Sequence, residues 1–75
     1  MPKLPHCTPR KVLAALLRYG FYIHHRTGSH INLRFLDKPH LHVVIAYHNR
    51  ELAPKTLKSI IIQAELTVQE FIDLL

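Results

Sequence analysis

The hydrophobic positions near the start of the chain repeat with the period of an α-helix. The apolar residues that recur three or four positions apart are Val12, Leu13, Leu16 and Leu17. Thr8 can cap the free backbone N–H groups of a helix, and Pro9 suits its first position, where no N–H is missed. Gly20 supplies a stop signal. We therefore expect a helix from Pro9 to about Tyr19 that packs through its apolar stripe.

From Phe21 the pattern changes to a period of two, which is typical of β-strands. The stretches that show it are FYIHHR, HINLRF and LHVVIA, at residues 21–26, 30–35 and 41–46. One face of the first two strands would carry Phe21, Ile23, His25, Ile31, Leu33 and Phe35. The other face would carry Tyr22, His24, Arg26, His30, Asn32 and Arg34, joined by His42 from the third strand. Turns at Thr27-Gly28-Ser29 and at LDKPH would join the strands, because Gly28 can adopt a positive φ. The sequence thus predicts a three-stranded antiparallel meander with one wet, basic face, and it places His25 on the apolar face as a partly buried histidine.

Two further helices are predicted in the last third of the chain. The first runs from about Pro54 to Ala64 and turns inward the residues Leu57, Ile60, Ile61 and Ala64. Thr67 and Glu70 fit a capping box that opens a short last helix, whose apolar face is Val68, Phe71, Ile72 and Leu75. Residues 1–75 would then form a single α+β domain, a two-layer α-β-β-β-α sandwich with helices on one face of the sheet and a short extra C-terminal helix. A double-stranded-RNA-binding domain has the same order of elements.

The positive charge of the chain is concentrated in its first half. The net charge is +5; residues 1–36 contain six basic residues and no Asp or Glu, whereas residues 37–75 contain four basic and five acidic residues. Such one-sided charge attracts a polyanion, most simply nucleic acid, or an acidic protein that imitates one, although it also aids solubility. No apolar run approaches the ~20 residues needed to span a bilayer. The single Cys7 cannot form an internal disulfide, so we expect a cytoplasmic protein without a membrane partner.

Short motifs follow one another in a specific order along the chain. They are Gly20-Phe21 after the first helix, the triplet Gly28-Ser29-His30, His48 after the third strand, and the Leu-x-Pro-x-Thr-Leu-x-x-Ile pattern of residues 52–60. With these motifs, the stretches LLRYGFYIHHRTGSHINLRF and HNRELAPKTLKSIIIQAELTVQEFIDLL give the chain its likeness to a known family. It resembles the HicA family of bacterial toxins over nearly its whole length.

The resemblance implies a small double-stranded-RNA-binding-like domain that cleaves messenger RNA without a metal or other cofactor and arrests growth. It implies that His30, the histidine of the triplet, is catalytic. It also implies an antitoxin of the HicB type, encoded beside the toxin, that masks the active surface. The toxin would be a monomer when free and part of a hetero-oligomer with its antitoxin, in a bacterial or archaeal cytoplasm.

The chain departs from the family pattern outside the triplet. Ala46 stands in a segment where the family often has proline before the histidine, and Lys55 stands where glycine usually precedes the helix threonine. Ile62 replaces a residue that is commonly basic, and Glu65 replaces a glycine at the helix end. These departures bear on the path of the loop before His48 and on phosphate binding along the helix.

The triplet can also be judged by the chemistry of RNA cleavage. Without a metal, the reaction needs a base for the 2′-hydroxyl proton, positive charge for the phosphorane oxygens and an acid for the departing 5′-oxygen. Histidine titrates near neutral pH and can serve as base or acid, so His30 can fill one of these roles. The expected RNA-binding residues are Arg26 and Arg34 on the same face as His30, Gly28 and Ser29 in the turn, and Lys55 and Lys58 as weaker candidates. The second proton carrier stays open among His24, His42 and a water molecule.

Other interpretations are open at this point. The order of elements and the charge also suit a non-catalytic double-stranded-RNA-binding module, and the basic face also suits a protein-interaction domain that docks an acidic partner. His40 and His42, with His24 as a neighbour, have a spacing that zinc can use, but without cysteine pairs or a carboxylate we assign no metal site. His48 fits the role of a loop anchor as well as that of an acid.

Overall fold

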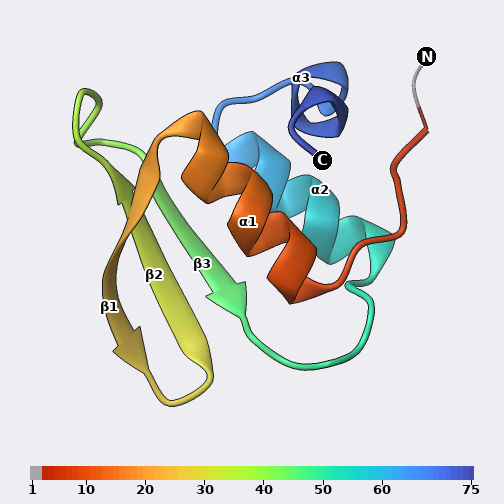
Figure 1. Cartoon of the computed structure of the whole chain (residues 1–75), viewed down its shortest axis with the longest axis horizontal. Coiled ribbons are helices and arrows are strands. Elements are labelled where there is room, and N and C mark those ends of the chain that lie inside the picture. Colours follow the sequence, from red (N-terminus) through yellow and green to blue (C-terminus); the bar gives the residue numbers. More distant parts are fainter. Residues whose placement is uncertain (1–2) are drawn as a thin grey trace.

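The computed structural model describes residues 3–75, in which the elements follow the order α1-β1-β2-β3-α2-α3 (Figure 1). Their bounds are Pro9–Tyr19 for α1, Phe21–Thr27 for β1, His30–Phe35 for β2, His42–Ala46 for β3, Pro54–Gln63 for α2 and Val68–Asp73 for α3. This order confirms the predicted α+β class, with its three consecutive strands and its short last helix. Within residues 3–75 no helix is both long and apolar enough to cross a lipid bilayer.

The strands form one antiparallel sheet in the order β1-β2-β3, and its two faces differ in burial. The buried face carries Ile31, Leu33, Val43 and Ile45. Because α1 packs on β1 and β3, and α2 packs on β3, the helices cover this face, as Figure 1 shows with the strands on the left and the helices on the right. The pairing places on the opposite face, which we call the open face, Tyr22, His25, Thr27, His30, Asn32, Arg34, His42, Val44 and Ala46.

Helix ends follow the predicted capping chemistry. Thr8 caps α1 through its hydroxyl, and Gly20 closes it with a φ of 130°. At α3 the hydroxyl of Thr67 accepts a hydrogen bond from the Glu70 N–H at 3.0 Å, and the Glu70 carboxylate accepts one from the Thr67 N–H at 2.8 Å. The capping box is therefore confirmed, and it fixes where the last helix begins.

Two predicted apolar stripes need correction, while the α2 stripe of Leu57, Ile60, Ile61 and Ala64 is buried as predicted. In α1 the small Ala15 is buried, and Leu17, predicted to face inward, is 41% exposed. Burial follows geometry here and not side-chain size, because position 15 lies on the same helical face as Val12. In α3 Phe71 is fully buried, but Leu75 is 47% exposed because the helix ends at Asp73 and helical spacing no longer places it.

A β-bulge in β1 changes the predicted faces of the hairpin. The pairing runs regularly from Phe21 to Ile23, shifts by one residue, and resumes with His25 opposite Asn32 and Arg26 opposite Ile31. Since an extra residue inverts the alternation that follows it, His25 moves to the open face and Arg26 moves to the helix side. The prediction of a partly buried His25 was wrong, because this residue is exposed. The prediction that Arg26 shares a face with His30 was also wrong.

The carboxyl end of α2 is closed by a Schellman motif in which Glu65 adopts a left-handed conformation. Glu65 has a φ of 57°, its N–H donates to the Ile62 carbonyl at 3.0 Å, and the Leu66 N–H donates to the Ile61 carbonyl at 3.1 Å. This position favours glycine, because a Cβ is crowded there. The glycine typical of the HicA family at this place is therefore explained by backbone geometry, and the chain retains the geometry with a glutamate.

Candidate functional site

The triplet Gly28-Ser29-His30 lies at the tip of the hairpin that joins β1 to β2. Thr27 and His30 are the last paired residues, so Gly28 and Ser29 form the two-residue loop. Gly28 has a φ of 59°, and a Cβ built on it would meet no atom within 4 Å. The Tyr47 N–H donates to the Ser29 carbonyl at 2.7 Å, which ties the loop to the segment after β3. We call residues 26–30 the hairpin end of the sheet.

His30 differs from the other histidines of residues 3–75 in its hydrogen bonding. Those with a polar partner within hydrogen-bond distance are His6, His24, His25, His40, His42 and His48. Among the described residues, none forms a hydrogen bond with the His30 side chain, which is exposed on the open face. Both ring nitrogens of His30 are thus available to a ligand.

The middle of the open face holds a set of interacting imidazoles. His42 donates from Nε2 to Oδ1 of Asn32 at 3.1 Å, and the Nδ1 atoms of His24 and His25 lie 2.9 Å apart. Desolvation lowers the pKa of His42, and the charges of Arg34, His25 and His24 lower it further. A lowered pKa favours the neutral ring, which can still donate a hydrogen bond or take up a proton.

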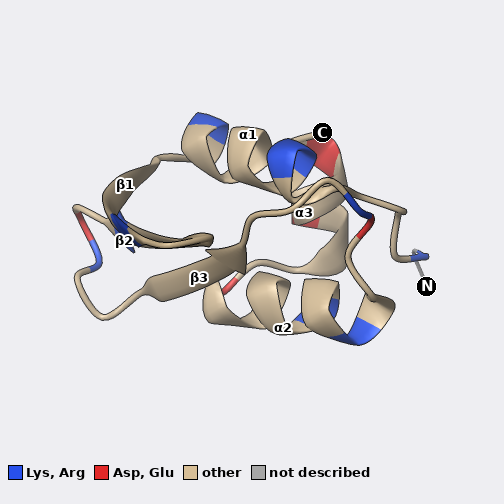
Figure 2. Cartoon of the chain, turned by 90° about the horizontal axis from the view of Figure 1, so that it is seen from below, with Lys and Arg blue, Asp and Glu red and all other residues tan. Residues whose placement is uncertain are grey.

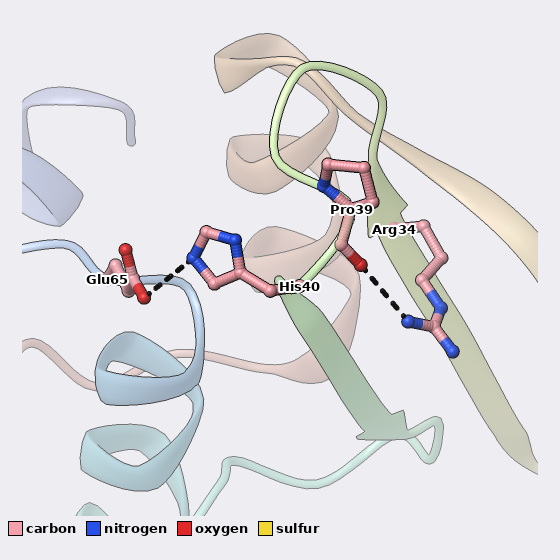
Figure 3. Close-up of polar contacts among 4 residues, drawn as sticks. All are labelled: Arg34, Pro39, His40 and Glu65. Carbon is pink, nitrogen blue, oxygen red and sulfur yellow. Dashed lines mark hydrogen bonds and ion pairs between the residues drawn. The ribbon is translucent and has the colours of Figure 1, made fainter.

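Two polar contacts near the far end of the sheet are drawn in Figure 3. The guanidinium of Arg34 donates to the Pro39 carbonyl at 3.4 Å, and Nε2 of His40 lies 3.1 Å from the Glu65 carboxylate. We call this group of four residues the anchored end of the sheet. Arg34 shares a face and a strand with His30, but it lies four positions further along, which is about 13 Å of extended strand. Arg34 is therefore not a neighbour of the His30 ring.

Arg26 lies close to His30 along the backbone but on the opposite side of the sheet. Its guanidinium carbon lies 5.8 Å from the centroid of the Tyr47 ring, within the range of a cation–π contact. The hairpin end thus has a cation on its helix side and an imidazole on its open side. A ligand that touches both must pass over the tip of the hairpin.

Lys55 and Lys58 are exposed on α2 and lie apart from the hairpin end. In Figure 1 the amino end of α2 lies across the molecule from the β1–β2 hairpin, and in Figure 2 the basic positions of α2 and α1 lie on opposite sides. These lysines can contact only a ligand that extends across the protein.

The described residues do not bring histidines together as a metal site would require. Residues 3–75 contain no group of three or more His, Cys, Asp or Glu side chains placed to hold a metal ion. His40 is directed to Glu65 and His42 to Asn32, so their imidazoles do not converge. The zinc arrangement considered for His24, His40 and His42 therefore has no geometric basis in this part of the chain.

The sequence prediction of the site missed four residues that line a pocket near the hairpin end. The pocket has a volume of about 530 Å³ and is lined by Thr8, Arg10, Tyr47, His48 and Asn49, of which only His48 was considered as a site residue. These residues come from two segments far apart in the sequence, the start of α1 and the loop after β3. Only tertiary structure joins them, so no spacing rule could have found them. A smaller pocket of about 280 Å³ lies at the edge of the open face near Arg34 and Leu36.

The fold and the exposed hairpin histidine define a small, basic α-β-β-β-α protein with a free imidazole at one end of its sheet. A family model described as HicA toxin of bacterial toxin-antitoxin matches residues 9–66, from the start of α1 to just beyond α2. The match includes the triplet and leaves α3 outside. The chain therefore belongs to the HicA toxin family of toxin–antitoxin systems, which confirms the resemblance seen in the motifs. No curated protein sequence gave a match.

Proposed function

We propose that this protein is the toxin of a type II toxin–antitoxin system and acts as a metal-independent endoribonuclease on messenger RNA in the cytoplasm. His30 is the catalytic residue in this proposal, and a HicB-type antitoxin neutralises the toxin. Family membership supports the toxin role. The observation that carries the assignment to His30 is its free imidazole, exposed at the hairpin end while every other histidine of residues 3–75 has a polar partner.

The proposed reaction is a transesterification at a phosphorus atom within the RNA strand. His30 takes the proton of a ribose 2′-hydroxyl, and the resulting oxygen attacks the adjacent phosphorus. The bond from phosphorus to the 5′-oxygen of the next nucleotide breaks, which gives a 2′,3′-cyclic phosphate and a 5′-hydroxyl. The departing oxygen takes a proton from water or from a second imidazole. One positioned proton carrier raises the reaction rate by about 10²–10⁴-fold, so we expect slow turnover.

In this proposal a cation and a hydroxyl at the hairpin tip stabilise the phosphorane oxygens. Arg26 lies on the helix side next to the turn, and Ser29 can donate its hydroxyl from the loop. Gly28 leaves the loop open, because no atom stands within 4 Å of the place where a Cβ would be. Arg34, Lys55 and Lys58 serve more distant phosphates of a strand that crosses the protein.

The experiment that tests this function is induced expression of the chain in bacterial cells without an antitoxin. We expect the wild-type protein to stop growth and His30→Ala to restore it. His6→Ala is the matched control, because His6 is an exposed histidine whose ring contacts Glu51 instead of standing free. It should remain toxic.

Circular dichroism of the purified variants separates loss of function from loss of fold. Growth arrest by folded His30→Ala would contradict the assignment of His30. Steeply salt-dependent RNA binding with intact RNA and no growth arrest would instead indicate the non-catalytic double-stranded-RNA-binding module.

A further inference from the structure

The pocket of about 530 Å³ lies at the same end of the molecule as the hairpin end. Its walls are the first turn of α1, with Thr8 and Arg10, and the segment Tyr47–Asn49 that follows β3. In Figure 1 the start of α1, the end of β3 and the β1–β2 loop all lie in the lower half of the molecule. Its volume is within the range of pockets that bind small ligands.

Backbone hydrogen bonds hold these walls in place. The Tyr47 N–H donates to the Ser29 carbonyl at 2.7 Å, and the Leu52 N–H donates to the Cys7 carbonyl at 2.8 Å. The first bond connects the pocket to the hairpin loop, and the second connects the loop after β3 to the segment before α1. The pocket is therefore formed without a ligand, which reduces the entropy that binding would cost.

The side chains of the pocket suit one class of ligand, a nucleotide of a single strand. Tyr47 is half-buried, packs against the core and presents an aromatic ring, while Asn49 is an exposed amide with both donors and acceptors. Arg10 lines the pocket and Arg26 lies over the Tyr47 ring, so two guanidinium groups are present and no lining residue is acidic. Single-stranded RNA is recognised by stacking of bases on aromatic rings, by hydrogen bonds to base edges and by cations at phosphates.

A backbone hydrogen bond also sets the tautomer of His48, in a way that suits binding of a nucleotide in the pocket. Its Nδ1 accepts a hydrogen bond from the Arg50 N–H at 3.1 Å. The neutral ring must then carry its proton on Nε2, where it can donate to an acceptor in the pocket.

We propose that this pocket binds the base and phosphate of a nucleotide adjacent to the one at His30. This inference rests on the proposed function and deepens it by naming a second RNA subsite. His30 pairs with Ala46, and Tyr47 follows directly, so the subsite is next to the hairpin end but on the helix side of the sheet. An RNA strand bends over the hairpin tip, with its reacting ribose at His30 and the neighbouring base against Tyr47. Arg10 and Arg26 bind the phosphate that joins the two nucleotides.

The experiment uses a 2′-O-methylated tetranucleotide, which cannot react through its 2′-oxygen, and the full chain labelled with ¹⁵N. We expect chemical shift changes at the amides of Tyr47, His48 and Asn49. Arg10→Ala should weaken the affinity about tenfold, and Tyr47→Leu at least about fivefold, the smaller end of the range for loss of base stacking. Lys11→Ala is the matched control, since Lys11 is the next residue of α1, carries the same charge, is exposed and does not line the pocket. It should weaken the affinity no more than about twofold through long-range charge.

Failure of the subsite and failure of the nuclease function give different results. Equal losses of tetranucleotide affinity for Arg10→Ala and Lys11→Ala, or chemical shift changes confined to the open face, would overturn the subsite. If the protein still cleaved a transcript, the nuclease function would stand. Pocket binding without any cleavage of an unmodified transcript would support the subsite and reject the nuclease. Shift changes in the pocket that arise only with the antitoxin, and never with the tetranucleotide, would assign the pocket to the protein partner and overturn our inference.

Discussion

The polar side chains at the two ends of the sheet differ in whether they are hydrogen-bonded to the rest of the protein. At the anchored end, Arg34 donates to Pro39 and His40 contacts Glu65, so both side chains are bound to the protein itself (Figure 3). At the hairpin end, His30 has no hydrogen-bond partner among residues 3–75. Arg34 of the anchored end and His30 of the hairpin end lie on the same strand, β2, and His40 lies in the turn before β3.

This difference shows that residue type alone does not identify a functional group. A ring with one paired nitrogen keeps the other nitrogen for a ligand, whereas both ring nitrogens of His30 are unpaired among residues 3–75. The chain has histidines at seven positions, and within residues 3–75 His30 is the one whose ring has no hydrogen-bond partner. The predictions below test this contrast between the ends.

The largest expected difference concerns RNA affinity. Arg26→Ala removes a cation beside the hairpin end and should weaken binding of single-stranded RNA about tenfold, lowering the slope of log affinity against log salt by about 0.7. Arg34→Ala removes a side chain that is bound to Pro39 at the other end, and should cost about twofold. Fluorescence anisotropy at several salt concentrations measures both. A larger loss of RNA affinity for Arg34→Ala than for Arg26→Ala would indicate that the RNA binds at the anchored end.

The second prediction concerns the backbone of the hairpin loop. Gly28 has a φ of 59° and open space around it, so Gly28→Ala is strained by its conformation and not by a clash. We expect the free energy of unfolding to fall by about 1 kcal/mol, as measured by urea denaturation. Gly28→Asn should cost less, because asparagine tolerates the left-handed region. Equal costs for the two variants would mean that this φ does not limit the loop.

The third prediction applies the same reasoning at the anchored end, where Glu65 has a φ of 57°. Glu65→Gly relieves the crowded Cβ but removes the exposed contact with His40 and adds freedom to the unfolded chain. We expect a net gain in unfolding free energy of less than about 1 kcal/mol. Glu65→Ala keeps the strain and loses the contact, so it should be destabilising. A Glu65→Gly protein less stable than Glu65→Ala would refute the backbone explanation.

The smallest expected effect is on the pH dependence of stability through His42. Because its pKa is lowered in the folded protein, the unfolded chain binds a proton at higher pH than the folded chain does. His42 therefore lowers stability as pH falls through its ordinary value of 6.5 toward the folded pKa. His42→Gln should reduce the loss of stability between about pH 7.5 and pH 5.5. A larger loss in this variant would show that the shift has the opposite sign.

Most of the fold could be predicted because local patterns and packing agree. Thr8, Pro9 and Gly20 mark the ends of α1, and Thr67 with Glu70 marks the start of α3. The bulge at His24 could not be predicted, because nothing in FYIHHR shows where an extra residue enters the strand. That one residue moved His25 to the open face and Arg26 to the helix side.

The candidate site was predictable only in the part that is local in sequence. The triplet Gly28-Ser29-His30 lies within one turn, so its motif and its geometry coincide. The pocket formed by Arg10, Tyr47 and Asn49 joins two distant segments, and the sequence carries no pattern for it. The single aromatic ring of that pocket gave no signal among the scattered aromatic residues of the chain.

The measurement that tests the central claim most directly is the rate at which purified protein cleaves a transcript in the presence of EDTA. We expect wild-type protein and His6→Ala to yield fragments that end in a 2′,3′-cyclic phosphate, and folded His30→Ala to be slower by about 10²–10⁴-fold. Equal rates for the wild type and His30→Ala would contradict the claim that the free imidazole at the hairpin end performs the proton transfer.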